Sequence, residues 1–448
     1  MKPSIMIDET LLRQLVRDLV GIDSVNSTLV PGARGEAVAA EFVQDFLRRH
    51  GIDADLQDAV AGRPNVVAIL GASPDAPKVL QRSSEPQAPP GYRPTEDTKS
   101  TEGFDVPLPG VLPSNRGQLY ASMSGTMAVN SAECDRPALA ILAHIDTVGT
   151  GDMVDPFTPR ERDGRLFGRG ALDIKSGVAA MCAAAIALVK EGKMFSRPLL
   201  LAAVVDEECD SAGTQNLLRK YKADAAIVLE PTDLKLVIAH KGYAWYEIIS
   251  HGHAAHGSLP AEGRDAIRFM GRVLTKLDEA ERFLCTHAPH RLLGRASLHA
   301  SLISGGQELS SYPAECRLQL ECRTLPGQTE AETEAELRRL LGNLRSADPD
   351  CDATLRLLGS RPPYEISPDA PIACSAALAI REVTGRSAEM AGMAAWTDTA
   401  LLWAAGIPGI VFGPTGRGLH GAEEYVELDS ISVCAEVLRR LILKLCCQ

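Results

Sequence analysis

Three short apolar runs in the first half of the chain each end in polar side chains. They are ALAILAH (138–144), PLLLAAVVDEE (198–208) and AAIVLEP (225–231). Helical periodicity separates them, over about 175–191 and 211–221. Continuous apolar strands that alternate with helices favour a mostly parallel sheet that is covered on both faces. Ligands of such sheets bind outside the carboxyl ends of the strands, so the polar ends of these runs mark the expected site.

A different pattern begins near residue 236 and predicts a second, smaller domain. Residues 236–251 alternate like a half-exposed strand, and further helices and strands follow in a βαββαβ order. This order is typical of an antiparallel sheet with two helices on one face, a ferredoxin-like α+β arrangement. Buried-strand character returns at 405–414, so we expect the small domain to be inserted into an α/β catalytic domain. The predicted limits are 1–235 and 355–448 for the catalytic domain and 236–354 for the inserted domain.

Residues 72–136 fit neither pattern. This segment is rich in Pro, Gly, Ser and Thr and has no apolar periodicity. Such a composition buries too little apolar surface to offset the entropy of ordering the chain. We therefore expect an irregular insert in the first part of the catalytic domain.

Composition argues against several kinds of partner. The net charge is −12 and there is no long basic run, which disfavours nucleic acid. Acidic residues interrupt the first 24 positions, where a signal peptide needs an unbroken apolar core, and the most apolar stretches are shorter than a membrane span. The eleven cysteines form no C-x-x-C pair and are typical of reduced thiols. We expect a cytoplasmic protein that binds neither nucleic acid nor membranes.

Side chains that commonly bind metals stand at the predicted strand ends or in nearby loops. They are His144, Asp173, Glu208, Glu230 and His420. Carboxylates mixed with imidazole suit zinc or a similar first-row divalent ion. Five ligands are more than one catalytic zinc takes when a position stays open for water, but they suit two ions if one carboxylate bridges. Asp146, two residues after His144, would accept the other ring N–H of that histidine and fix its tautomer.

Each of these motifs alone also has a structural explanation. An H-x-D pair is more often a surface or capping pair, and GRGALD (168–173) also fits a glycine turn before a helix. That segment resembles the dinucleotide-binding pattern G-x-G-x-x-G only superficially, because its last position is Asp173. The acidic run DEE (206–208) is a common feature of solvated surfaces. Their occurrence together and in this order favours the metal site.

The combined motifs resemble the dinuclear-zinc aminoacylase/carboxypeptidase metallopeptidases, a family that includes acetylornithine deacetylase and succinyl-diaminopimelate desuccinylase. The resemblance covers nearly the whole chain outside 72–136. The motifs that carry it are SVNSTLVPGARGE, GRPNVVAILG, AHIDTV, GRGALDIKSG, DEE, HKGYAWYEIISHGHAAHGSLPAEGRDAI, ISGGQELSSYPAECRLQLECRTLPG, AAWTDTALL and GIPGIVFGPTGRGLHGAEEYVEL. This resemblance implies a zinc-hydrolase catalytic domain whose inserted small domain serves as a lid and dimerisation domain.

The resemblance also implies two zinc ions per chain, for which Co²⁺ or Mn²⁺ could substitute. Asp173 would bridge the two ions. His144 and Glu230 would complete one site, and Glu208 and His420 the other.

Catalytic roles follow from the same resemblance. Glu207, directly before a ligand, matches the general base, and a hydroxide held by the two metals would attack the amide carbonyl. His256 matches a small-domain histidine that stabilises the reaction oxyanion, in several relatives across a dimer interface. Without the motif, His251, His253 and His256 could not be told apart, because a histidine-rich turn is often only surface.

Three further residues match substrate-side positions of the family. Arg323 matches an arginine that binds a substrate carboxylate, and its planar guanidinium suits that task. Spacing alone also allows Arg323 to pair with Glu315 or Glu321 across a sheet. Ser310 stands where many relatives have Asn, so specificity does not carry over. Asp398 lies in a family motif near the site.

We therefore predict a metal-dependent amide hydrolase that releases the acyl group of N-acyl amino acids and forms a homodimer through its small domain. A metallo-carboxypeptidase or dipeptidase with the same site is the alternative, in which Arg323 would bind the C-terminal carboxylate of a short peptide. A non-catalytic binding relative is disfavoured, because the base Glu207 and all five candidate ligands are present.

Overall fold

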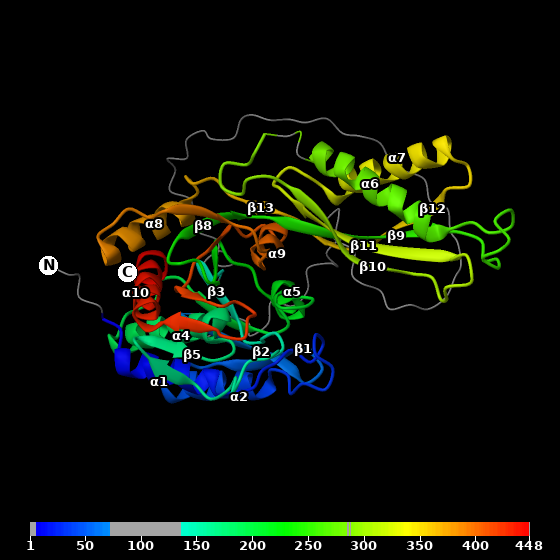
Figure 1. The fold of residues 1–448 in the computed structure, drawn as a ribbon. Helices are drawn as coiled ribbons and strands as arrows, with labels where there is room; N and C mark the ends of the chain where they lie inside the picture. Colours follow the sequence, from blue (N-terminus) through cyan, green and yellow to red (C-terminus); the bar gives the residue numbers. More distant parts are fainter. Residues whose placement is uncertain (1–5, 72–135, 285, 287, 448) are drawn as a thin grey trace.

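A computed structural model of the chain describes residues 6–71, 136–284, 286 and 288–447. Figure 1 shows two lobes, of which the larger contains both ends of the described chain and the smaller is formed by a middle segment. The insert predicted at 72–136 lies outside the described residues, except for Arg136.

The larger lobe is built on a nine-stranded sheet of order β1-β2-β6-β3-β7-β15-β8-β13, in which β14 also pairs with β8. The strands are β1 (Asp55–Val60), β2 (Arg63–Leu70), β3 (Leu139–His144), β6 (Leu199–Val204), β7 (Ala226–Val228), β8 (Leu236–His240), β13 (Tyr364–Glu365), β14 (Met390–Met393) and β15 (Gly409–Val411). The four strands β6, β3, β7 and β15 are parallel, whereas β2 and β8 join them antiparallel. The α/β class is confirmed, but the sheet is mixed rather than mostly parallel.

Helices cover both faces of this sheet. Successive side chains of a strand point to opposite faces, so Ile141 packs into the larger core and Leu142 into the smaller one. The larger core is formed with α1 (Glu9–Val20), α2 (Ala37–Arg49), α4 (Ser176–Lys190), α8 (Pro371–Thr384) and α10 (Leu428–Cys446), and the smaller with α5 (Ala212–Lys220) and α9 (Thr399–Ala404).

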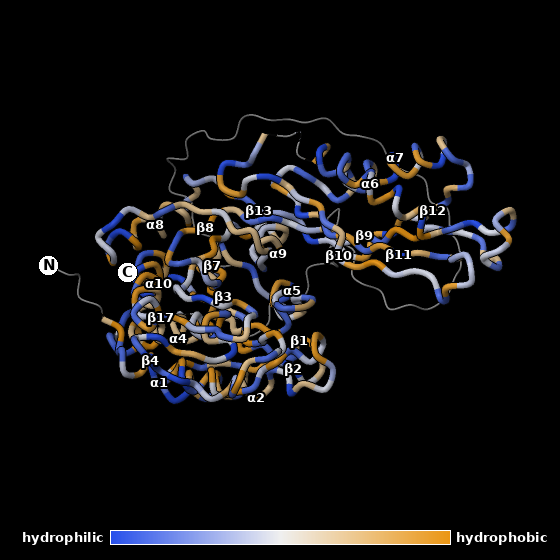
Figure 2. The backbone as a smooth tube through the Cα atoms, viewed as in Figure 1, coloured by the Kyte–Doolittle hydropathy of each residue, from blue (hydrophilic) through white to orange (hydrophobic). Residues whose placement is uncertain are grey.

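One helical stretch among the described residues has the length and composition of a membrane span, although we expected the apolar stretches to be too short. It covers Ala171–Lys190, and 89% of its most apolar window is buried inside the fold. Helix α4 contacts α1, α10 and β3, and Figure 2 shows it among other apolar segments of the larger lobe. A helix that is apolar on all sides is typical of such a buried position.

The smaller lobe has the predicted βαββαβ order. Its strands are β9 (Gly242–His251), β10 (Ser297–Gly305), β11 (Glu315–Thr324) and β12 (Asp352–Arg361), and its helices are α6 (Ala266–Leu284) and α7 (Glu330–Ala347). The sheet order is β10-β11-β9-β12, every pair is antiparallel, and both helices cover one face (Figure 1). Strand β12 continues to Arg361, beyond the limit predicted at 354, and the domain limits themselves stay a prediction.

A third, small antiparallel sheet lies beside the parallel strands. Its order is β16-β17-β5-β4, with β4 (Arg160–Arg162), β5 (Arg165–Phe167), β16 (Gly416–Arg417) and β17 (Tyr425–Glu427). Strand β5 precedes the irregular helical turn η1 (Ala171–Lys175), and β16 and β17 flank the loop that contains His420. This sheet therefore brings two candidate ligand loops together from distant parts of the chain.

Candidate dinuclear metal centre

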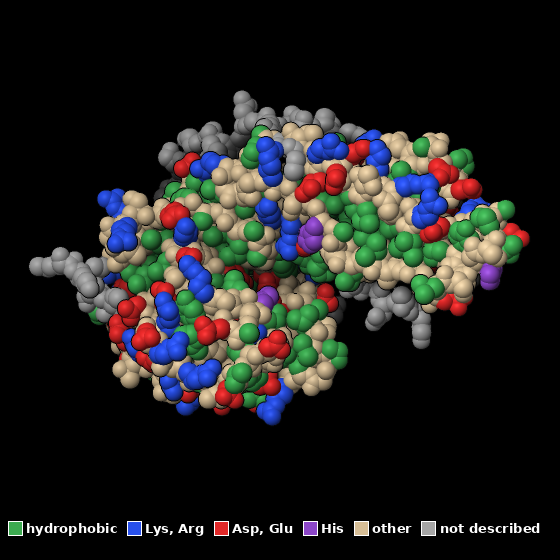
Figure 3. Space-filling model, in the orientation of Figure 1, with side chains coloured by type: hydrophobic (Ala, Val, Ile, Leu, Met, Phe, Trp, Pro, Cys, Tyr) green, Lys and Arg blue, Asp and Glu red, His purple; other side chains and the backbone are tan. Residues whose placement is uncertain are grey.

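Three adjacent parallel strands present the candidate residues at one edge of the sheet. Strand β3 ends at His144, and β6 and β7 lie on either side of it. Glu207 and Glu208 follow the end of β6, and Glu230 follows the end of β7. Parallel strands place their carboxyl ends at the same edge, so these three glutamates gather at the same edge as His144. Figure 3 shows a hollow between the two lobes with acidic and histidine side chains at its floor.

The five candidate ligands form two groups that share Asp173. One group is His144, Asp173 and Glu230, the other is Asp173, Glu208 and His420, and the ligand atoms of each lie within 4.8 Å of one another. Asp173 Oδ1 lies 3.2 Å from His144 Nε2, and Asp173 Oδ2 lies 3.2 Å from His420 Nε2. A carboxylate with one oxygen in each group is the arrangement that a bridging ligand requires. The structure thus brings together all five residues, whose role as ligands stays a prediction.

The donor set fits divalent cations. Among the described residues, Glu208 Oε1 and Glu230 Oε1 are buried and accept no hydrogen bond, and Glu208 Oε1 lies 3.4 Å from His420 Nε2. Burying a carboxylate oxygen without a partner costs free energy, which a bound cation would offset. Two histidines and three carboxylates match the ligands that zinc and similar ions take at catalytic sites.

Both histidines hold their protons tightly in the metal-free protein. Burial lowers the pKa of His144, but its contacts with Asp146 and Asp173 outweigh burial and hold that pKa well above its usual value. Contacts with Asp173 and Glu208 raise the pKa of His420 to about 10. Each histidine must lose a proton to bind a metal, so we expect metal binding to release protons.

Two buried glutamates of the site, Glu207 and Glu230, also have raised pKa values. Burial, followed by the charge of Glu230, raises the pKa of Glu207 well above its usual range. Burial also raises the pKa of Glu230, although His144 acts against it. A general base needs a pKa near the working pH, and a buried carboxyl beside other carboxylates is how proteins reach it.

Asp146 connects the histidine to the loop that carries the base. Its carboxylate accepts the backbone N–H of Glu207 at 3.2 Å and that of Glu208 at 3.1 Å. The Nδ1 atom of His144 lies 3.0 Å from the backbone carbonyl oxygen of Asp146 and 3.5 Å from its carboxylate. The carbonyl is thus the nearer partner of His144, where we expected the carboxylate.

A buried polar network behind Asp146 was missed from the sequence. Asn26 Nδ2 donates to Asp146 at 2.8 Å and to Asp206 at 3.1 Å. The guanidinium of Arg63 donates to Asp206 at 2.8 Å and forms two hydrogen bonds with Glu36. The segments SVNST and GRPNVV carried the resemblance but gave no sign that their polar side chains meet beneath the site.

Asp398 is a buried residue of the larger lobe. It is 1% exposed, directly precedes α9, and accepts a hydrogen bond of 2.5 Å from the Thr214 hydroxyl. Burial raises its pKa to about 6, with smaller effects from its hydrogen bonds and from the charge of His144. Asp398 therefore belongs to the buried part of the site, and its predicted contact with substrate stays a prediction.

Arg323 lies near the junction of the two lobes. Its guanidinium is 2.8 Å from Glu321, one of the two partners that the spacing allowed, and lies over the ring of Tyr243 at 5.5 Å. Burial raises the pKa of Tyr243, with further effects from the charges of Arg361 and Glu207. Tyr243, unassigned from the sequence, thus lies within electrostatic reach of the base.

Arg361 also joins the two lobes directly. Its guanidinium donates to the backbone carbonyl of Asp210 at 3.3 Å and lies 5.6 Å from the ring centre of Trp396. Asp210 follows Glu208 in the base loop. The end of β12 is therefore held against the loop that carries the candidate base.

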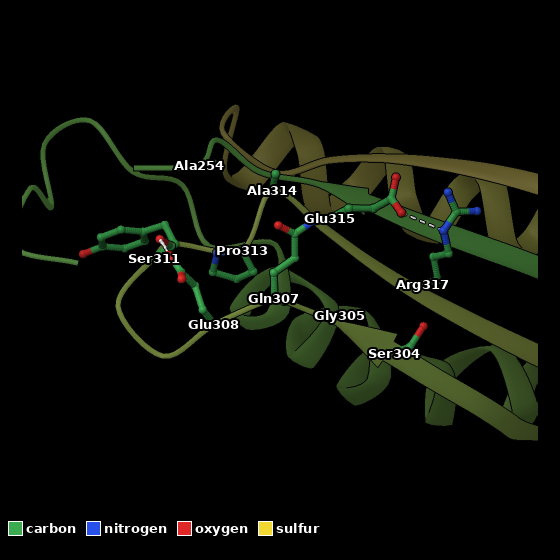
Figure 4. Close-up of a pocket in the computed structure, with 12 residues that line it drawn as sticks. Ala254, Ser304, Gly305, Gln307, Glu308, Ser311, Pro313, Ala314, Glu315 and Arg317 are labelled. Carbon is green, nitrogen blue, oxygen red and sulfur yellow. Dashed lines mark hydrogen bonds and ion pairs between the residues drawn. The ribbon is translucent and has the colours of Figure 1, made fainter. Parts of the chain in front are cut away.

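His256 and Ser310 are neighbours in the smaller lobe. A backbone bridge pairs His256 with Ser311, and the N–H of Gly257 donates to the Ser310 carbonyl at 2.6 Å. The exposed ring of His256 lies 2.7 Å from the Ser258 hydroxyl. A cavity of about 500 Å³ beside this turn is shown in Figure 4, and its lining includes Ala254, Ser304, Glu308, Ser311 and Arg317.

This turn lies at the opposite end of the small sheet from Arg323. Arg323 pairs with Tyr243 at the start of β9, whereas Glu315 pairs with His251 at its end. The positions of Arg323 and Glu315 on one strand are separated by roughly 27 Å at about 3.4 Å per residue. The structure therefore places His256 and Ser310 together, but far from Arg323 within the same chain.

Two candidate cation-binding groups that share a carboxylate, with a further carboxylate beside them, have the arrangement of a dinuclear metallohydrolase site. The model of Peptidase family M20/M25/M40 matches residues 140–444 of this chain, so the protein belongs to that family. This membership confirms the resemblance found in the sequence and the prediction of an enzyme that hydrolyses amide bonds.

Known relatives agree with this assignment. Over 316 residues the chain is 29% identical to an acetylornithine deacetylase of Buchnera aphidicola. This match covers 68% of this chain and 79% of that protein. The fold of this chain is similar to that of aminopeptidase PepT of Bacillus cereus, with a TM-score of 0.69 and 16% identity. The match covers 98% of this chain and 99% of the aminopeptidase. The YXEP protein of Bacillus subtilis, a dinuclear metal-binding peptidase of the same family, matches with a TM-score of 0.63, 14% identity, and coverage of 98% of each chain.

Proposed function

We propose that this protein removes the acyl group from N-acyl amino acids. The observation that carries the proposal is the pair of ligand groups that share Asp173, with Glu207 directly before one of the ligands. Similarity to acetylornithine deacetylase supports an acylated amino acid as the substrate. The half-buried guanidinium of Arg323 near the junction of the lobes supports a substrate that carries a carboxylate.

The proposed mechanism divides the work among the side chains of the site. Ions held by the two groups would polarise the amide carbonyl and lower the pKa of a water from about 15.7 towards 7. Glu207 takes a proton from that water and transfers it to the leaving nitrogen. Asp146 keeps Glu207 in place through the backbone amide of the base. Arg323 donates two N–H groups to the substrate carboxylate.

We infer that His256 acts at the site of a partner subunit in a homodimer, because it lies at the far end of the small sheet from Arg323. Strand β10 forms one edge of that sheet, and its Leu302 and Ile303 side chains are 66% and 56% exposed. Figure 3 shows hydrophobic side chains gathered on the smaller lobe. An open edge strand with apolar side chains readily pairs with another chain, which supports dimerisation through this domain.

A cytoplasmic location also belongs to the proposal. All nine cysteines among the described residues are free thiols. Proteins of reducing compartments keep their cysteines in this state. Fractionation of the source cells, with the protein detected by antibody, tests this location.

Hydrolysis of a substrate panel by the zinc-loaded protein tests the proposed activity. The panel contains N-acetylornithine, other N-acyl amino acids and a set of dipeptides. We expect release of the acyl group from the former, and a loss of about 10²- to 10⁴-fold in Glu207→Gln. Glu389→Gln, which changes an exposed carboxylate of the same lobe, is the matched control and should keep wild-type activity. Preference for dipeptides would assign the alternative function, and hydrolysis of neither class would contradict both.

A further inference from the structure

A buried carboxylate holds the loop that carries Asp173. Glu424 is 1% exposed, and its Oε1 accepts the backbone N–H groups of Leu172 at 2.9 Å and Asp173 at 3.2 Å. Its Oε2 accepts the backbone N–H of Gly170 at 3.1 Å. One side chain therefore satisfies three backbone donors in the four residues that end at the shared carboxylate of the site.

Arg169 extends this contact to the loop that carries His420. Its Nη1 donates to Glu424 at 2.7 Å, and its Nη2 donates to the backbone carbonyl of Gly421 at 3.1 Å. The backbone N–H of Gly168 also donates to the carbonyl of Glu424 at 3.1 Å. Arg169 thus bonds to the loop that contains His420, and Glu424 bonds to the loop that contains Asp173.

The loops themselves are not held by regular structure. His420 has a φ of +58° and Gly170 a φ of +78°, both outside the conformations of helices and strands. A non-glycine residue in this region persists only when surrounding contacts hold it there. The small sheet aligns Phe167 of β5 with Tyr425 of β17, and the Arg169–Glu424 pair follows directly at its end. The pair therefore links the small sheet to the two loops that carry Asp173 and His420.

We propose that Glu424, together with Arg169, is a positioning pair for the metal subsite formed by Asp173, Glu208 and His420. The pair holds the two loops in register, so that His420 Nε2 and Asp173 Oδ2 stay within 3.2 Å. Neither side chain reaches the reacting atoms, and both act through the loops that they bind. This inference rests on the proposed dinuclear site. It assigns to that site two supporting residues that are not themselves metal ligands.

Calorimetric titration of the metal-free protein with Zn²⁺ tests the pair, with His420→Ala marking the binding step that belongs to this subsite. In Glu424→Gln one oxygen becomes an NH₂ donor that faces other donors. We expect a loss of about 10- to 100-fold in zinc affinity at that step, and a smaller loss at the other. Hydrogen exchange of the metal-free variant should show faster exchange at Gly170, Leu172 and Asp173 than in the wild type.

Glu436→Gln is the matched control, because Glu436 is also a 1% exposed carboxylate bonded to a buried arginine, Arg439, but lies in α10. It should lower the thermal midpoint and leave both zinc steps unchanged. If Glu424→Gln does not fold, Arg169→Lys loses the bond to Gly421 and supports the same measurement. Equal losses at both steps, or unchanged zinc binding, would overturn the positioning role. Failure of the wild-type protein to bind two ions would instead overturn the proposed dinuclear site.

Discussion

The carboxylate of Asp146 accepts the backbone N–H of Glu207, with 3.2 Å between Oδ1 and the amide nitrogen. Its second oxygen accepts the N–H of Glu208 and the side-chain amide of Asn26. Both oxygens are therefore occupied as acceptors, and the residue that we expected mainly to orient His144 also holds the loop of the base. This double use makes the site sensitive to a change of a single atom.

Replacement of Asp146 by Asn should slow catalysis. An asparagine has one acceptor oxygen, so its NH₂ group must face one of the N–H donors that the carboxylate now accepts. We expect kcat/KM of the zinc-loaded enzyme to fall by about 10- to 100-fold. Asp152→Asn, an exposed carboxylate later in the same segment, is the control. A loss of less than twofold in Asp146→Asn would contradict the role.

Replacement of Asp173 by Asn should reduce the number of bound zinc ions. Asp173 places one oxygen in each ligand group, whereas asparagine offers a single oxygen. We expect elemental analysis to find about two zinc ions per wild-type chain and no more than about one in the variant. Asp163→Asn changes an exposed carboxylate and should retain both ions. Two ions in Asp173→Asn would show that this residue does not bridge.

The stability of the metal-free protein should fall as the pH rises above about 6.5. The pKa of His420 is raised from 6.5 to about 10 in the folded protein. The charged imidazole therefore stabilises the fold fully below pH 6.5, and this stabilisation is lost as the pH rises through about 10. Because the side chain is about half exposed, solvent screening reduces the effect.

Chemical denaturation between pH 6 and pH 10 measures this dependence. We expect the free energy of unfolding to fall less steeply over this range in His420→Gln than in the wild type. His251→Gln removes a half-buried histidine of the smaller lobe and serves as the control. If the free energy of unfolding depends on pH in the same way in the wild type and in His420→Gln, the contacts of His420 with Asp173 and Glu208 do not stabilise the metal-free fold.

Mixed dimers should show whether His256 acts across subunits. A His256→Ala subunit keeps Glu207, and a Glu207→Gln subunit keeps His256, so a mixed dimer contains one complete site only if His256 acts at the partner. Subunits unfolded together and refolded at equal ratio should recover about a quarter of wild-type activity, since half of the random dimers are mixed. Each variant refolded without the other is the control. Activity that stays at the level of the single variants would place His256 in its own subunit.

Replacement of Arg323 by Ala should weaken substrate binding. A charged hydrogen bond contributes about 1.5–3 kcal/mol, so we expect KM for N-acyl amino acids to rise by about 10- to 100-fold with a smaller change in kcat. Arg317→Ala removes another guanidinium of β11, bonded to Glu315 at 2.6 Å, and should leave KM unchanged. A substrate whose α-carboxylate is replaced by an amide should be hydrolysed equally by wild type and Arg323→Ala. A persistent difference would assign Arg323 another role.

Much of the fold could be predicted because its signals are local. The apolar run that ends at His144 is a strand, and the acidic residues after β6 and β7 lie at the same edge of the sheet. The direction of parallel strands is enough to place these side chains together. The βαββαβ order of the smaller lobe was likewise visible in its alternating and helical periodicities.

Contacts between distant segments could not be predicted in this way. Nothing near Arg63 or Glu36 indicates that they meet beneath Asp146, and nothing near Glu424 indicates that it binds the amides beside Asp173. Charged residues in loops carry no periodicity, and their partners depend on how the strands order and pair. The antiparallel addition of β2 and β8 is another such outcome, because pairing direction leaves no mark in an apolar run.

The order of residues in the chain thus determined which side chains reach the sheet edge, since strand polarity and side-chain alternation are properties of each segment. The tertiary structure decided which of them meet. Asp173 faces both His144 and His420 where β5 pairs with β17 and Glu424 binds the backbone amide of Asp173. It also decided that His256 lies a strand's length from Arg323, because β9 and β11 extend the small domain away from the site.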